Sequence, residues 1–112
     1  MWMNGHERRA AIQLRGVLES GGNAIAMHLD AMGTDPRSHP EPVYVTEINE
    51  EASTVGLRST RNEHLVATVP LLYIEAVWRD AGDAAWRISV RGTLFVGRAS
   101  GMSSRFTPRV GG

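Results

Sequence analysis

The stretch that decides the fold is Trp86-Arg87-Ile88-Ser89-Val90-Arg91-Gly92-Thr93-Leu94-Phe95-Val96. Its first half alternates apolar and polar side chains, which is the period of a β-strand with one buried face. Gly92 interrupts the run before the apolar residues resume. A glycine inside a strand often marks a bulge or a sharp bend. The stretch therefore predicts a long strand that bends at Gly92, as at the corner of a β-barrel.

Further strands are predicted upstream of this stretch. Residues 71–78 form a mostly apolar run that ends at the turn-forming residues 80–83. Residues 43–48 and 55–57 alternate on either side of the polar turn 49–51, which indicates a β-hairpin. These runs make a mainly antiparallel β-structure the expected architecture.

The intervening segments carry no strand signal. Residues 35–42 contain three prolines, which lack a backbone donor and favour a loop. Residues 65–67 are interpreted as one helical turn that Pro70 closes, and residues 97–112 as a polar, Gly-rich tail that is frayed or docked on a partner.

The N-terminal segment predicts a helix over residues 6–20. Asn4 followed by Glu7 resembles a capping box, apolar residues then recur at helical spacing, and Gly21-Gly22 ends the pattern. Residues 23–29 favour a strand because they are short and follow two glycines, although their Ala and Met residues would also suit a helix.

Composition bounds the class of protein. The chain has 112 residues, a formal net charge of zero, 42% hydrophobic residues and no cysteine. The balanced charge argues against a protein whose main role is to coat nucleic acid or an anionic membrane. No apolar run is long enough to span a bilayer. The absence of cysteine excludes disulfides and thiolate sites and fits a reducing compartment. We expect one cytoplasmic domain over residues 1–112, with its core in 6–98.

Few residues suggest chemistry. The four histidines lack the spacing of a helical metal pair, so no metal site is predicted. The acidic residues of the turn 47–51 are interpreted as solvated, and no catalytic acid, base or nucleophile stands out. The segment Arg58-Ser59-Thr60-Arg61-Asn62-Glu63-His64 gathers guanidinium, hydroxyl and imidazole groups where a strand ends. That combination can bind a phosphate, although an ordinary polar connection remains the alternative.

Taken in order, these pieces resemble the pyridoxamine 5'-phosphate oxidase-like, FMN-binding split β-barrel family. The likeness covers about residues 10–98 and is carried by short motifs: the helix ending at Gly21-Gly22, the Pro-bearing approach 38–45, the strand and polar turn 55–65, and the run 86–96 with its Arg91-Gly92 pair. The resemblance implies a mainly β (α+β) fold, a split β-barrel of about six antiparallel strands with an N-terminal helix.

The resemblance also implies a function. Members of that family are homodimers that bind FMN at the subunit interface, and relatives use deazaflavin or haem. It implies a flavin-dependent oxidoreductase whose substrate is unknown. The alternatives are a non-catalytic dimeric domain for interaction or sensing and a haem protein using His28, His39 or His64. By position, the implied cofactor-binding residues are Val43, Tyr44 and Val45 along the ring, Arg58, Ser59, Thr60, Arg61 and His64 at the phosphate, and Arg91 from the long strand.

Overall fold

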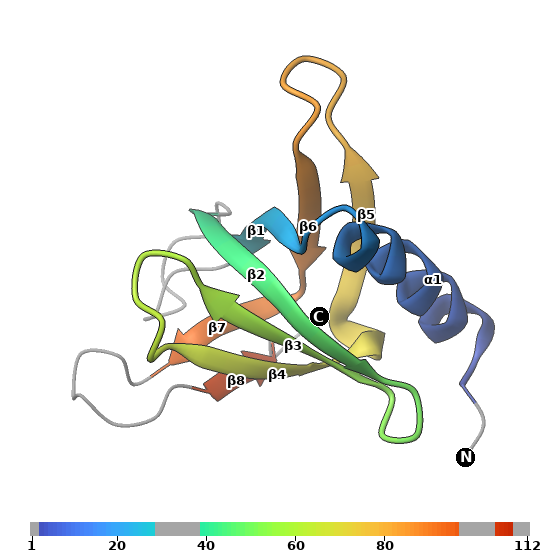
Figure 1. Cartoon of the computed structure of the whole chain (residues 1–112). Helices are drawn as coiled ribbons and strands as arrows, with labels where there is room; N and C mark the ends of the chain where they lie inside the picture. The colour runs from blue at the N-terminus through green and yellow to red at the C-terminus, as the bar shows by residue number, and fades with distance from the viewer. Residues whose placement is uncertain (1–2, 29–38, 97–104, 109–112) are drawn as a thin grey trace.

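The computed structural model describes residues 3–28, 39–96 and 105–108 (Figure 1). Along this part of the chain one α-helix precedes a series of strands. The elements are α1 (Gly5–Glu19), β1 (Asn23–His28), β2 (His39–Asn49), β3 (Thr54–Ser59), β4 (Val66–Pro70), the 3-10 helix η1 (Leu71–Tyr73), β5 (Ile74–Arg79), β6 (Trp86–Val90), β7 (Gly92–Val96) and β8 (Arg105–Pro108).

The strands form one large sheet and one small one. The six-stranded sheet has the order β4-β3-β2-β1-β6-β5, and β7 pairs with β8 separately. A mainly β, α+β fold with an N-terminal helix is thus confirmed. The expected antiparallel arrangement is wrong at one place, because β1 and β6 run parallel at the centre of the sheet. Within the described residues the sheet does not close, since its edge strands β4 and β5 do not pair with each other.

Helix α1 is positioned by caps at both ends. The Asn4 side chain accepts from the Glu7 backbone and the Glu7 carboxylate accepts from the Asn4 backbone, so the predicted capping box is confirmed. At the other end, Gly22 N–H donates to Val17 O and Gly21 N–H donates to Leu18 O. These are the two bonds of a Schellman motif, and both glycines have positive φ.

The prediction of a loop over residues 35–42 is wrong for its last part; residues 35–38 lie outside the described residues. Strand β2 begins at His39, and Pro40 and Pro42 lie opposite Met27 and Ile25 of β1. The Pro42 carbonyl accepts from Thr60 N–H, so the donorless Pro42 nitrogen faces the same side, where β3 has already ended at Ser59. The strand tolerates its prolines because no ladder bond is required there.

Three other expectations need correction. Val66–Pro70 is strand β4 and not a helical turn, because Ala67 and Val69 alternate into the core. The predicted strand 71–78 starts later, at Ile74, after the 3-10 turn η1. The tail is not wholly irregular, since Arg105–Pro108 pairs with β7 as β8; residues 97–104 and 109–112 lie outside the described residues. The bend at Gly92 is confirmed, because β6 ends at Val90 and β7 enters the second sheet.

A single apolar cluster joins the helix to both sheets. Leu14 and Val17 of α1, Val43 and Val45 of β2 and Phe95 of β7 are all fully buried in it. Fully burying one such side chain contributes about 1.5–3 kcal/mol. None of the helices that the structure describes is long and apolar enough to cross a membrane.

Candidate functional site

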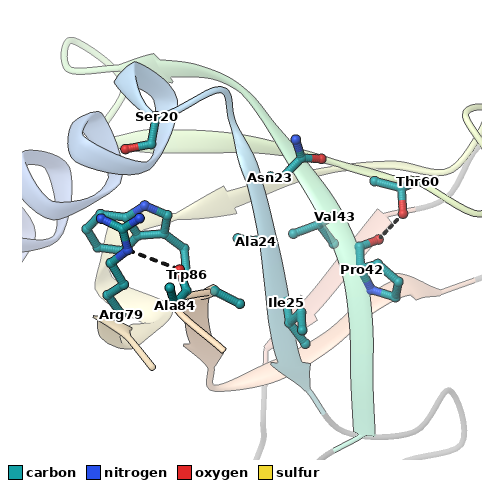
Figure 2. A pocket seen from close by; sticks show the side chains of 11 residues that line it. Ser20, Asn23, Ala24, Ile25, Pro42, Val43, Thr60, Arg79, Ala84 and Trp86 are labelled. Carbon is teal, nitrogen blue, oxygen red and sulfur yellow. Dashed lines mark hydrogen bonds between the residues drawn. The ribbon is translucent and has the colours of Figure 1, made fainter. Parts of the chain in front are cut away.

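A cleft of about 400 Å³ opens at one end of the large sheet, beside the C-terminal end of α1 (Figure 2). Its size falls within the range of small-molecule sites. It lies among the C-terminal end of α1, strands β1 and β2, and the β5–β6 hairpin. The lining residues are Ser20, Asn23, Ala24, Ile25, Pro42, Val43, Thr60, Arg79, Ala84, Ala85 and Trp86.

The cleft exists because two parallel strands diverge. Strand β1 pairs with β2 from Asn23 onward, but it pairs with β6 only from Ile25 onward, opposite Arg87. The residues that come just before this pairing, Asn23-Ala24 on β1 and Ala85-Trp86 on the other side, line the cleft. The gap therefore follows from the register of β6 and not from an irregular loop.

Trp86 forms one wall of the cleft. The indole packs toward Gly16 of α1, where an added Cβ would lie 3.7 Å from the ring, an ordinary van der Waals distance. The guanidinium of Arg79 lies over the indole ring, 5.7 Å from the ring centroid, and its Nε donates to Ala84 O at 3.0 Å (Figure 2). The indole N–H of Trp86 is buried and has no hydrogen-bond partner within the described part of the chain. The wall thus combines an aromatic face with a positioned cation.

Pro42 and Thr60 form the opposite side. Pro42 O accepts from the backbone N–H of Thr60 at 3.0 Å and from its hydroxyl at 3.3 Å. These bonds fix the place where the chain leaves β3. Figure 2 shows Thr60 and Pro42 on the far side of β1 from Arg79 and Trp86. Ile25 of β1 and Val43 of β2 also line the cleft.

Of the residues that the family resemblance implies, Val43 and Thr60 line the cleft. Tyr44 lies beside it, because its cross-strand partner on β1 is the lining residue Asn23. Arg58 is the partner of Tyr44 on β3, and its guanidinium lies 5.6 Å from the Tyr44 ring centroid. Gly22 supports this pair, since a Cβ there would lie 2.8 Å from the Tyr44 ring.

The remaining implied residues lie elsewhere. Val45 is fully buried in the core. Arg61 and His64 are exposed on the turn after β3 and do not line the cleft. Arg91 lies over the Tyr73 ring at 5.9 Å and donates its backbone N–H to Tyr73 O. The structure does not bring these three arginine and histidine side chains to one place in the cleft.

Ser59 faces the core, where it joins a buried polar network. Its hydroxyl donates to Glu41 Oε2 at 3.3 Å and accepts the backbone N–H groups of Arg61 and Asn62. Glu41 Oε1 lies 3.8 Å from His28 Nε2, and all three side chains are buried. Because Leu94 N–H donates to His28 Nδ1, the ring proton of the neutral imidazole is on Nε2, toward Glu41. This arrangement fits a structural role that ties β1, β2, β3 and β7 together.

Sequence reasoning missed Arg79, Trp86 and Glu41. Arg79 and Trp86 are cross-strand partners at the mouth of the turn 80–85, so the hairpin register could have paired them. Glu41 was hidden within the Pro-rich segment that suggested a loop. Within the described residues, no three His, Asp or Glu side chains gather into a group that could hold a metal.

Comparison with known proteins adds no relative. No protein-family model, curated protein or solved structure matches the chain.

Proposed function

We propose that the cleft binds a planar heteroaromatic cofactor of the flavin type, with FMN the first candidate. The observation that carries the proposal is the cleft itself, about 400 Å³ in volume and bounded by the indole of Trp86, the side chains of Ile25 and Pro42, and Val43. Flat apolar and aromatic walls with a few polar groups suit an aromatic ring. Two implied cofactor residues, Val43 and Thr60, line it.

The chain's own contribution would be binding and orientation. The residues that line the cleft include no carboxylate, imidazole or thiol, so the lining offers no acid or base. When bound, a flavin supplies hydride or electron transfer, and the protein positions its ring. The proposal therefore assigns the reactivity to the cofactor and leaves the substrate open, with deazaflavin as a chemically similar candidate.

The same proposal includes a homodimer, as the family resemblance implies, and a cytoplasmic location, which the absence of cysteine fits. Large apolar side chains are exposed on the described surface, with Leu72 at 48% and Trp78 at 39%. A second copy would cover such groups. Light scattering at micromolar concentration, with and without FMN, is expected to give twice the chain mass. A monomer under both conditions would contradict the proposed homodimer.

The binding test uses FMN titrated into the purified protein and followed by quenching of flavin fluorescence. Ile25→Trp places a larger side chain in the lining of the cleft. It is expected to weaken FMN binding by tenfold or more, about 1.4 kcal/mol. Ile12→Trp is the matched control, because Ile12 is 65% exposed on α1 and does not line the cleft. Absence of binding to the wild type would reject the proposal and favour the non-catalytic dimeric domain.

A further inference from the structure

We propose that Arg79 is the anion-binding residue of the cleft, so that the ligand is an aromatic molecule whose phosphate or carboxylate group lies at the β5–β6 hairpin. This inference rests on the proposed function for the identity of the ring, but its argument is separate. It assigns the charged end of the ligand to a place that the family resemblance does not imply.

Charge within the cleft is the first ground. Of the lining residues, Arg79 is the one with a charged side chain, and the others are apolar or neutral. Arg58 and Arg61 do not line the cleft, and Arg58 is stacked on Tyr44. An anionic group bound inside the cleft would therefore meet the guanidinium of Arg79 before any other cation.

Preorganisation is the second ground. The Arg79 side chain is held at two points, by its Nε bond to Ala84 O at 3.0 Å and by the Trp86 ring at 5.7 Å. Both contacts leave the terminal Nη groups as donors. A guanidinium that is already fixed loses little side-chain entropy when it binds a carboxylate or phosphate in a two-pronged manner.

Backbone strain at Ala84 supports the same point. Ala84 has a φ of 58°, a left-handed conformation that is unfavourable for a residue with a Cβ. In this conformation its carbonyl accepts from Arg79, while the next residue, Ala85, accepts from Asp80 N–H. Strained turns of this kind often occur where a side chain must be aimed.

The nearby acids are occupied with other groups. Asp83 Oδ2 lies 2.8 Å from Arg87 Nη2 and Asp80 Oδ1 lies 3.7 Å from Arg87 Nε. The backbone N–H groups of Asp83 and Gly82 hold the pKa of Asp80 below its usual value, so this carboxylate stays charged for the turn and for Arg87. Within the described residues, no carboxylate pairs with Arg79.

The ligand class follows from these neighbours. The indole of Trp86 and the side chain of Ile25 suit a flat ring, and the Nη groups of Arg79 suit a phosphate or carboxylate. For FMN this places the phosphate at Arg79, and the turn with Arg58 and Arg61 is not its main contact. FMN and riboflavin differ by that phosphate alone, so they separate the contribution of the charge from that of the ring.

The experiment measures the dissociation constants of FMN and riboflavin for three proteins by fluorescence quenching at fixed ionic strength. The wild type is expected to bind FMN about tenfold or more tightly than riboflavin, because a charge-assisted hydrogen bond to the phosphate contributes that much affinity. Arg79→Gln is expected to lose that preference while its affinity for riboflavin changes less than about threefold. The double variant Arg58→Gln with Arg61→Gln is expected to keep it. Circular dichroism confirms that each variant is folded.

The outcomes separate the two proposals. A preference for FMN that survives in Arg79→Gln, or that disappears in the Arg58/Arg61 variant, would overturn the assignment of Arg79. If the wild type binds neither flavin, the flavin proposal fails while the assignment of Arg79 is still testable. In that case the binding of 1-naphthyl phosphate, 1-naphthoate and 1-naphthol is compared by NMR chemical-shift changes. Equal binding of the three by wild type and Arg79→Gln would overturn the assignment, and a loss confined to one anion would identify the charged group.

Discussion

Replacing Gly22 by alanine tests how the end of α1 supports the surface beside the cleft. Gly22 has a φ of 89°, and a Cβ at this position would lie 2.8 Å from one carbon of the Tyr44 ring and 3.2 Å from the next. The left-handed backbone costs an L-residue about 1–2 kcal/mol. The ring must also move, which disturbs its contact with Arg58, worth about 0.5–1 kcal/mol at an exposed site. We expect Gly22→Ala to lower the free energy of unfolding by about 1.5–3 kcal/mol.

Gly21 provides the matched control for this variant. It lies in the same Schellman motif with a φ of 110°, but a Cβ there would meet nothing within 4 Å. Gly21→Ala therefore carries the backbone cost alone, and the change in unfolded-state entropy is common to both variants. The difference between the two, about 0.5–1 kcal/mol, belongs to the contact with Tyr44.

The assay is urea denaturation at equilibrium, followed by far-UV circular dichroism. In a Tyr44→Ala background the two alanine variants are expected to cost the same, because the ring that distinguishes them is gone. Equal costs for Gly21→Ala and Gly22→Ala in the wild-type background would refute the reasoning, since they would show that the Tyr44 ring is free to move.

Four further predictions concern the caps, the buried network and the hairpin. Asn4→Ala breaks the capping box and is expected to cost about 1 kcal/mol in urea denaturation; no change would mean that the first turn is held by other contacts. Glu41→Gln keeps an acceptor for the Ser59 hydroxyl, whereas Glu41→Ala removes it and is expected to cost about 1–3 kcal/mol more in the same measurement. Trp86→Phe removes a buried N–H without a partner in the described structure and is expected to be neutral or stabilising by about 1 kcal/mol, while Trp86→Ala costs about 3 kcal/mol; a destabilised Trp86→Phe would point to an acceptor for that N–H. The carboxyl of Asp80 is expected to titrate by NMR below its ordinary pKa of 3.8, so its contribution to stability is present above that pH and is lost as pH falls through the lowered value.

Local signals in the sequence predicted the local parts of the fold. The capping box at Asn4, the glycine stop at Gly21-Gly22 and the bend at Gly92 each depend on a few neighbouring residues, and each is confirmed. Strand β4 was predicted as a helical turn because Val66-Ala67 is too short to show the two-residue alternation of a strand. The start of β2 was predicted as a loop because a strand accepts prolines only where no partner strand needs their hydrogen bonds, which here depends on where β3 ends. Both depend on a partner strand that is distant in the sequence.

Most of the candidate site could not be predicted for the same reason. Apart from Arg91, the residues implied by the resemblance come from β2, from β3 and from the turn after β3, and β2 and β3 form a local hairpin. Arg79 and Trp86 reach the cleft through β6, which pairs in parallel with β1 about sixty residues earlier in the chain. No hydrophobic period encodes that pairing, because the same alternation of side chains suits either strand direction.

The register of β6 also explains why the cation stands where it does. Because β1 and β6 pair only from Ile25 and Arg87 onward, Trp86 and its cross-strand partner Arg79 lie where β6 is not yet paired with β1. The indole of Trp86 packs toward Gly16 of α1, and the guanidinium of Arg79 lies over its ring. A shift of β6 by one residue would turn Trp86 to the other face of the sheet and separate it from the cleft. The positions of the aromatic wall, Trp86, and of the proposed anion-binding group, Arg79, therefore both depend on where the parallel strands β1 and β6 begin to pair.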